Sequence, residues 1–133
     1  MSEQHMRRRV LQWLKPLDAI PVENPAQPGT PDVNFIEGWV ELKKLNTWPK
    51  KREAVVICKH FTPQQRNWLF LRTRKNGNAW LLVQVKNEWL LFKGDIAAEH
   101  FGKVNRETLC QLAEAYWPSG LRAEELRAKL TRA

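Results

Sequence analysis

Apolar and polar residues alternate along residues 39–45, which read Trp-Val-Glu-Leu-Lys-Lys-Leu. Strand side chains point to opposite faces with period two, so the pattern predicts a strand with one buried face. Val40 and Leu42 would then lie on one face, and Glu41 and Lys43 on the other. The two charged residues are therefore expected to lie close together above a sheet.

A second strand is predicted at about residues 32–35, directly before this one. Residues 36–38 between them make a plausible turn, in which Gly38 is able to adopt a positive φ. An antiparallel return through this turn would bring Asp32 beside Glu41. The sequence therefore predicts a hairpin that pairs two carboxylates.

Apolar residues at helical spacing follow Ser2, a candidate N-cap, and predict a helix over residues 2–15 whose stripe is made by Met6, Val10, Trp13 and Leu14. A second helix is predicted to open at Thr62, where Gln65 completes a Thr-x-x-Gln capping box. Gly77 is a credible stop for this helix.

The remaining segments complete an alternation of helices and strand pairs. In chain order they are a short extended piece at Ile20 and Val22, a basic loop over 46–52, a short strand or buried loop over 54–58, strands over 79–85 and 89–92, and helices from Asp95 to about Gly102, from Asn105 to Tyr116, and over 121–131. This order fits an α/β fold, a mixed central sheet flanked by α-helices. We expect one domain over residues 1–133, with a core at about 1–93 and C-terminal helices at about 95–131.

Length and composition fit a globular domain, since the chain has 133 residues and a hydrophobic content of 43%. It has no apolar run of about 18 residues, so no transmembrane helix is expected. No long apolar stretch follows Arg7–Arg9, so a secretory signal is not expected either. Cys58 and Cys110 lack zinc-binding spacing and are expected to be free thiols in a cytoplasmic protein.

The formal charge of +8 favours a polyanionic partner. Basic residues cluster at four places, and seven tryptophans are interleaved with them. We expect most of these tryptophans in the core or at an interface, and one or two to stack on nucleic acid. The basic clusters lie at residues 7–9, 43–44, 50–52 and 72–75.

Two carboxylates beside an amine are the groups that a divalent metal and phosphate chemistry need. Each residue also has an ordinary alternative. Asp32 alone would cap a turn, and Glu41 with Lys43 would form a weak pair on a solvated strand face. It is the combination, backed by a buried opposite face, that favours catalysis.

The segments Gly29-Thr30-Pro31-Asp32 and Glu41-Leu42-Lys43 resemble the signature of the PD-(D/E)XK nuclease superfamily. Residues 61–69 look like the glutamine-bearing helix of VRR-NUC and of phage or archaeal resolvase-like nucleases. Glu3 matches the glutamate of an N-terminal helix in many of these enzymes. The resemblance covers roughly residues 1–93 and implies the PD-(D/E)XK α/β core.

The resemblance implies a Mg²⁺-dependent DNA endonuclease, with Mn²⁺ as a substitute. Asp32 and Glu41 would bind one or two metal ions, helped by the backbone carbonyl of Leu42. Glu3 would be a third ligand, through water, although an exposed helix glutamate is its ordinary alternative.

Lys43 would orient the attacking water or stabilise the charge that builds on the phosphate. Gln65 would fix the water or Lys43, although its alternative role is only to cap its helix. Gln64 competes with Gln65 for the family position, and we favour Gln65 for its spacing to Trp68-Leu69.

Backbone phosphates are expected to contact basic residues from three of the clusters, namely Arg7, Arg8, Arg9, Lys44, Lys50, Lys51 and Arg52. Resolvase-like relatives suggest branched DNA, such as a four-way junction, cut by a homodimer. A flap, nicking or restriction-type nuclease, and a non-catalytic nucleic-acid-binding accessory protein, are the alternatives. Small size and basic charge are compatible with a phage protein in a bacterial cytoplasm.

Overall fold

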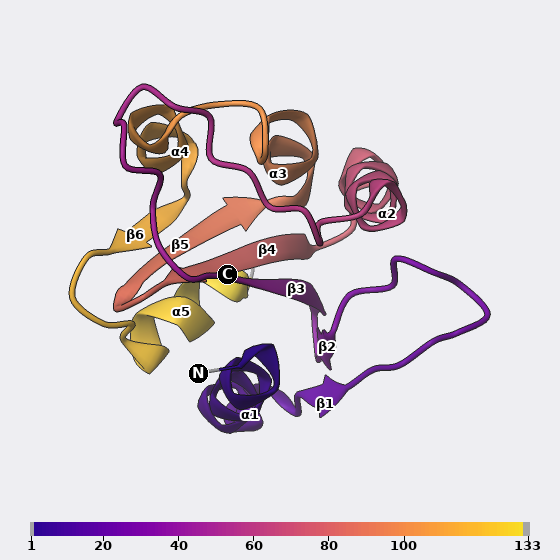
Figure 1. Ribbon diagram of the computed structural model, residues 1–133. Coiled ribbons are helices and arrows are strands. Elements are labelled where there is room, and N and C mark those ends of the chain that lie inside the picture. The colour runs from indigo at the N-terminus through magenta and orange to yellow at the C-terminus, as the bar shows by residue number, and fades with distance from the viewer. Residues whose placement is uncertain (1, 132–133) are drawn as a thin grey trace.

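The computed structural model describes residues 2–131 and is built around a six-stranded mixed sheet (Figure 1). The strands lie in chain order across the sheet: β1 (Ile20–Pro21), β2 (Val33–Phe35), β3 (Gly38–Leu45), β4 (Ala79–Val85), β5 (Glu88–Lys93) and β6 (Ala115–Trp117). β3 and β4 run parallel, and the other neighbouring strands are antiparallel. The α/β class with a mixed sheet, predicted from the sequence, is thereby confirmed.

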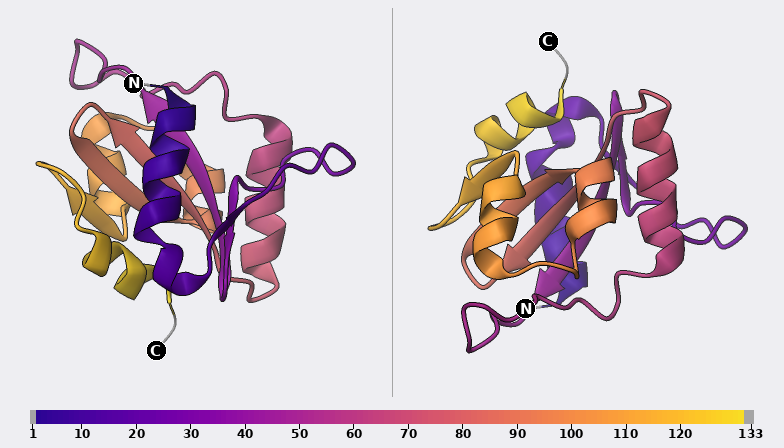
Figure 2. Two further views of the ribbon diagram at one scale, coloured as in Figure 1. Left: turned by 90° about the horizontal axis from the view of Figure 1, so that it is seen from below. Right: turned by 90° about the horizontal axis from the view of Figure 1, so that it is seen from above.

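Helices cover both faces of this sheet (Figures 1 and 2). One face carries α1 (Glu3–Trp13) and α5 (Ala123–Leu130), whose buried residues share a core with Val40 and Leu42. The other face carries α2 (Pro63–Arg74), α3 (Gly94–His100) and α4 (Arg106–Leu112). A short 3₁₀ helix (Lys15–Leu17) follows α1. Within residues 2–131, none of the helices combines the length and apolar surface that crossing a bilayer requires.

The hairpin of β2 and β3 forms as predicted, with Val33 paired to Val40. Gly38, however, does not adopt the expected positive φ. A Cβ at this position would lie 2.0 Å from the carbonyl oxygen of Asn78, so close backbone approach is what requires glycine here.

The start and end of α2 follow the local signals in the sequence. Thr62 and Gln65 form the predicted capping box. At the other end, Asn76 has a positive φ of 63°, and the Gly77 N–H donates to the carbonyl of Arg72. The Asn76 N–H also donates to the Thr73 carbonyl, and the two bonds form a Schellman motif. The helix α2 therefore ends just before Gly77, as the sequence predicted.

The C-terminal third differs from the prediction in two places. The residue before α3 is Lys93, so Asp95 lies in the first turn and not at the N-cap. Asn105 caps α4 as expected, but the helix ends at Leu112 and does not continue to Tyr116. Residues 115–117 form strand β6 instead, because the free edge of β5 offers backbone partners that outweigh local helix propensity.

Candidate active site

Asp32 directly precedes β2, and the hairpin register, continued by one residue beyond the Val33–Val40 pair, brings it in line with Glu41 on β3. Its carboxylate accepts the Leu42 N–H, with 2.9 Å between Oδ2 and the nitrogen. The N–H and C=O of one strand residue point to the same edge, so the Leu42 carbonyl also faces this edge, beyond the end of β2. The two carboxylates and this carbonyl are therefore brought together.

Glu41 is the unusual member of the group, because its side chain is only 1% exposed. Its Oε1 atom has no hydrogen-bond partner among residues 2–131. Burial, together with the nearby charge of Asp32, raises the pKa of Glu41 to about 10, although Lys43 acts in the opposite direction. Without a cation, Glu41 is therefore expected to be protonated at neutral pH, and a bound cation would favour its ionised form.

Lys43 is held from two sides on the same face of β3. Its Nζ atom donates to the backbone carbonyl of His60 at 2.9 Å and lies 3.6 Å from Glu41 Oε2. The residue is 4% exposed, so these contacts fix the ammonium group in place. Glu41 and Lys43 share a face, as the strand pattern predicted.

A pocket of about 290 Å³ opens beside Asp32 and reaches the first turns of α1. Asp32 and Leu42 line it from the hairpin, and Glu3, Gln4 and Arg7 line it from the helix. The N-terminal helix therefore supplies one wall of the candidate site.

Glu3 does not complete a cluster of metal-binding side chains by itself. Its Oε1 atom lies 2.7 Å from Nε2 of His60, across the mouth of the site. Within residues 2–131, no group of three or more His, Cys, Asp or Glu side chains is arranged to hold a metal ion. Glu3, the predicted third ligand, thus lines the pocket with Asp32 but is paired with His60.

His60 was not among the predicted site residues. Its backbone holds Lys43, its ring contacts Glu3, and the Cys58 sulfur lies 3.6 Å from its Nδ1 atom. The only local signal was its position just before the Thr62 cap. Nothing in the sequence indicated that the loop returns over β3.

Gln65 lies in the first turn of α2, five residues after His60. Its Oε1 atom accepts the Thr62 N–H at 3.0 Å, so the side-chain oxygen is used in the cap. The amide nitrogen is not needed for this bond.

The predicted DNA-contacting residues separate into groups. Arg7 lines the pocket, and residues 50–52 are exposed on the loop after β3. Arg8 is exposed on α1. The Arg9 guanidinium lies over the rings of Trp13 and Trp89, on the face of the sheet opposite Glu41. Lys44 alternates with Lys43 along β3, so it also points away from the Glu41 face.

No protein-family model and no curated protein matches the sequence. Among solved structures, the chain is similar to Archaeoglobus fulgidus Hjc, a Holliday junction resolvase from an archaeal hyperthermophile. The TM-score is 0.52 at 16% sequence identity, and the match covers 96% of this chain and 99% of that chain. At this identity the likeness shows the fold alone, and it agrees with the α/β fold of a mixed central sheet flanked by helices that the sequence predicted.

Proposed function

We propose that the protein is a metal-dependent DNA endonuclease that hydrolyses phosphodiester bonds. The observation that carries the proposal is the buried Glu41 carboxyl beside Asp32. Its Oε1 atom has no hydrogen-bond partner among residues 2–131, and its Oε2 atom lies 3.6 Å from Lys43 Nζ. Buried polar groups are ordinarily satisfied, and strongly shifted carboxylates concentrate at functional sites. Packing alone would give no reason to keep two acids together here.

The donor set suits Mg²⁺ or Mn²⁺, which prefer hard oxygen ligands. Asp32, Glu41 and the Leu42 carbonyl would hold the ion, and Glu3 would join through water. Cation binding would satisfy the free Glu41 oxygen and favour its ionised form. When bound, the ion would supply Lewis-acid stabilisation of the charge at the scissile phosphate.

The protein's own groups then position the reactants. Lys43, held by the His60 carbonyl, places an ammonium group where negative charge builds in the transition state. The Gln65 amide nitrogen is available to orient the attacking water. Because the chemistry leaves the protein mainly positioning and electrostatics, a small shift of these groups is expected to be costly.

Arg7 and the exposed residues 50–52 would hold backbone phosphates. For the substrate, we propose branched DNA, such as a four-way junction, by analogy with the fold of a Holliday junction resolvase. The reaction would take place in the cytoplasm. Flap, nicking and restriction-type cleavage are the other substrate classes that the test distinguishes.

We propose that a homodimer acts on the junction, because a two-fold arrangement can present two sites to two strands. Every tryptophan in the described residues is buried or half-buried, and Leu126 and Leu130 of α5 are buried, so these side chains offer little apolar surface for the dimer contact. The most exposed large apolar side chains among the described residues are Ile36, Ile57, Ile20 and Leu71, so a dimer would use surfaces other than the tryptophans.

The test is cleavage of matched duplex, flap, splayed and four-way DNAs with Mg²⁺, with Mn²⁺ and with a chelator. We expect metal-dependent cutting with a preference for four-way DNA, and its loss in Asp32→Asn. Asp18→Asn is the matched control, since Asp18 is exposed and its left-handed φ of 56° suits asparagine. Equal cutting of linear and branched DNA would reject the preference, and binding without any cleavage would indicate an accessory protein.

A further inference from the structure

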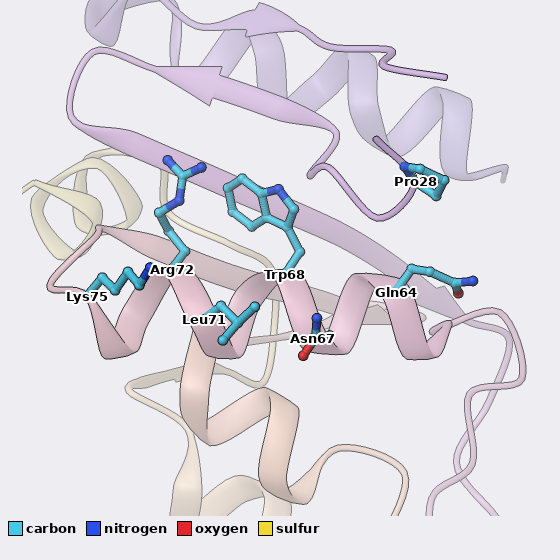
Figure 3. A pocket seen from close by; sticks show the side chains of 7 residues that line it. All are labelled: Pro28, Gln64, Asn67, Trp68, Leu71, Arg72 and Lys75. Atoms are coloured by element: carbon cyan, nitrogen blue, oxygen red, sulfur yellow. The ribbon is translucent and has the colours of Figure 1, made fainter. Parts of the chain in front are cut away.

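A second pocket, of about 490 Å³, lies along the outer side of α2 (Figure 3). One wall is α2 itself, from which Trp68 and Arg72 rise side by side. Pro28, in the loop between β1 and β2, forms the opposite wall. The pocket is separate from the one beside Asp32, and no step proposed above uses it.

The lining of this pocket combines flat surfaces with positive charge. The Arg72 guanidinium lies 4.3 Å from the Trp68 ring centroid, and the Trp39 ring meets Trp68 edge-on at 5.3 Å. Arg72 and Lys75 are both exposed, and the described residues that line the pocket include no carboxylate. Tryptophan rings and guanidinium planes are the surfaces on which unpaired bases stack.

Two exposed amide side chains, Gln64 and Asn67, complete the lining near the N-terminal end of α2. An amide carries both donors and acceptors, so it can pair with the edge of a base. A simple phosphate site would need the cations but would gain nothing from the aromatic ring. The composition therefore favours a nucleobase over a phosphate alone.

The pocket is tied to the candidate active site by the chain itself. Pro28 is four residues before Asp32, a distance of no more than about 14 Å along the chain. Between them, Gly29 has a φ of +94° and packs on α2, where a Cβ would lie 2.5 Å from the Gln64 carbonyl carbon. Trp39 also precedes Glu41 by two residues on the same face of β3.

We propose that this pocket binds one unpaired nucleobase of the DNA strand that is cut, close to the scissile phosphate. The inference rests on the proposed endonuclease function and specifies the substrate that the function would select. Removing a base from a duplex costs a few kcal/mol, and the cost is least for a base that is already unpaired. Trp68 and Arg72 would therefore favour branch points, gaps and flaps over intact duplex.

The experiment scans 2-aminopurine through the positions around the branch of a four-way DNA and of a flap, with chelator present so that no strand is cut. For the wild-type protein we expect a fluorescence change on binding at one position only. Arg72→Ala should remove this change and weaken binding about tenfold, since stacking contributes about 1–3 kcal/mol per base. Trp68→Phe, which keeps a ring in the half-buried site, should reduce it to an intermediate level.

Arg122→Ala is the matched control, because it removes the same charge from an exposed position near α5. If Arg72→Ala and Arg122→Ala weaken binding equally and without positional effect, the pocket proposal is overturned. It is also overturned if Leu71→Glu splits a dimer in light scattering and no 2-aminopurine position responds, since the groove is then an interface between two copies. Metal-dependent cleavage without a positional signal rejects the pocket alone, whereas a positional signal without any cleavage rejects only the endonuclease.

Discussion

Glu41 and Glu88 lie on strands of the same sheet, but their surroundings are opposite. Glu88 begins β5, and its carboxylate accepts hydrogen bonds from Trp48 at 2.7 Å, Tyr116 at 2.5 Å and Arg106 at 3.3 Å. Glu41 has Lys43 on one side, and its other oxygen has no hydrogen-bond partner among residues 2–131. Both carboxylate oxygens of Glu88 therefore accept hydrogen bonds, whereas Oε1 of Glu41 accepts none from residues 2–131.

The pKa directions express the same difference. Burial raises the pKa of Glu88, but the hydrogen bonds from Tyr116 and Trp48 and the charge of Arg106 together lower it below its ordinary value. Burial and Asp32 raise the pKa of Glu41 to about 10. A carboxylate surrounded by donors stabilises the fold, whereas one placed beside a second acid fits the cation binding proposed above.

The largest expected difference between these two acids is in cleavage. Glu41→Gln keeps the side-chain shape and removes the charge, so we expect single-turnover DNA cleavage to fall by at least about a thousandfold. Glu88→Gln should leave the rate within about threefold of wild type. Similar losses in both variants would mean that the unpartnered oxygen of Glu41 has no special part in the reaction.

For folding stability we expect the opposite order, with the larger loss on substitution of Glu88. Glu88→Ala leaves the donors of Trp48 and Arg106 without their acceptor, and we expect a loss of about 2–3 kcal/mol in the free energy of unfolding. Glu41→Gln removes a buried acid beside Asp32 and should raise stability in the presence of chelator. Urea unfolding at pH 8 measures both, and a destabilised Glu41→Gln would contradict the comparison.

The elements around the site were predictable because their signals are local. The alternation of Val40 and Leu42 with charged residues defined the faces of β3, and it also gave the pairing of Asp32 with Glu41. The capping box at Thr62 fixed the start of α2. Each of these features depends on residues within about ten positions of one another.

The rest depends on contacts between distant segments. Strand β6 exists because β5 presents an open edge, and Gly38 is constrained by the carbonyl of Asn78, forty residues away. The pairing of His60 with Glu3 and the support of Lys43 by the His60 carbonyl join three separate segments. No periodicity or spacing in the sequence reports on such contacts.

The sharpest separation of the two acids lies in the pH dependence of stability. The folded-state pKa of Glu41, about 10, exceeds its ordinary value of 4.5, so the folded protein binds the extra proton between these values. Stability therefore falls as pH rises through this range, by up to about 1.4 kcal/mol per pH unit. Glu88 has the opposite sign, because its pKa is lowered, and its contribution is lost as pH falls below the ordinary range.

Urea unfolding of the metal-free protein from pH 4 to pH 9 measures both slopes. Glu41→Gln should flatten the fall in stability that begins above about pH 4.5, and Glu88→Gln the loss at acidic pH, so the common titration of the other groups cancels in each comparison with wild type. Adding Mg²⁺ at pH 8–9 should restore stability to the wild-type protein but not to Glu41→Gln, since a cation binds the ionised carboxylate and favours the folded state. If the alkaline slope survives in Glu41→Gln, a group other than Glu41 causes this pH dependence. Mg²⁺ would then be expected to stabilise both proteins alike.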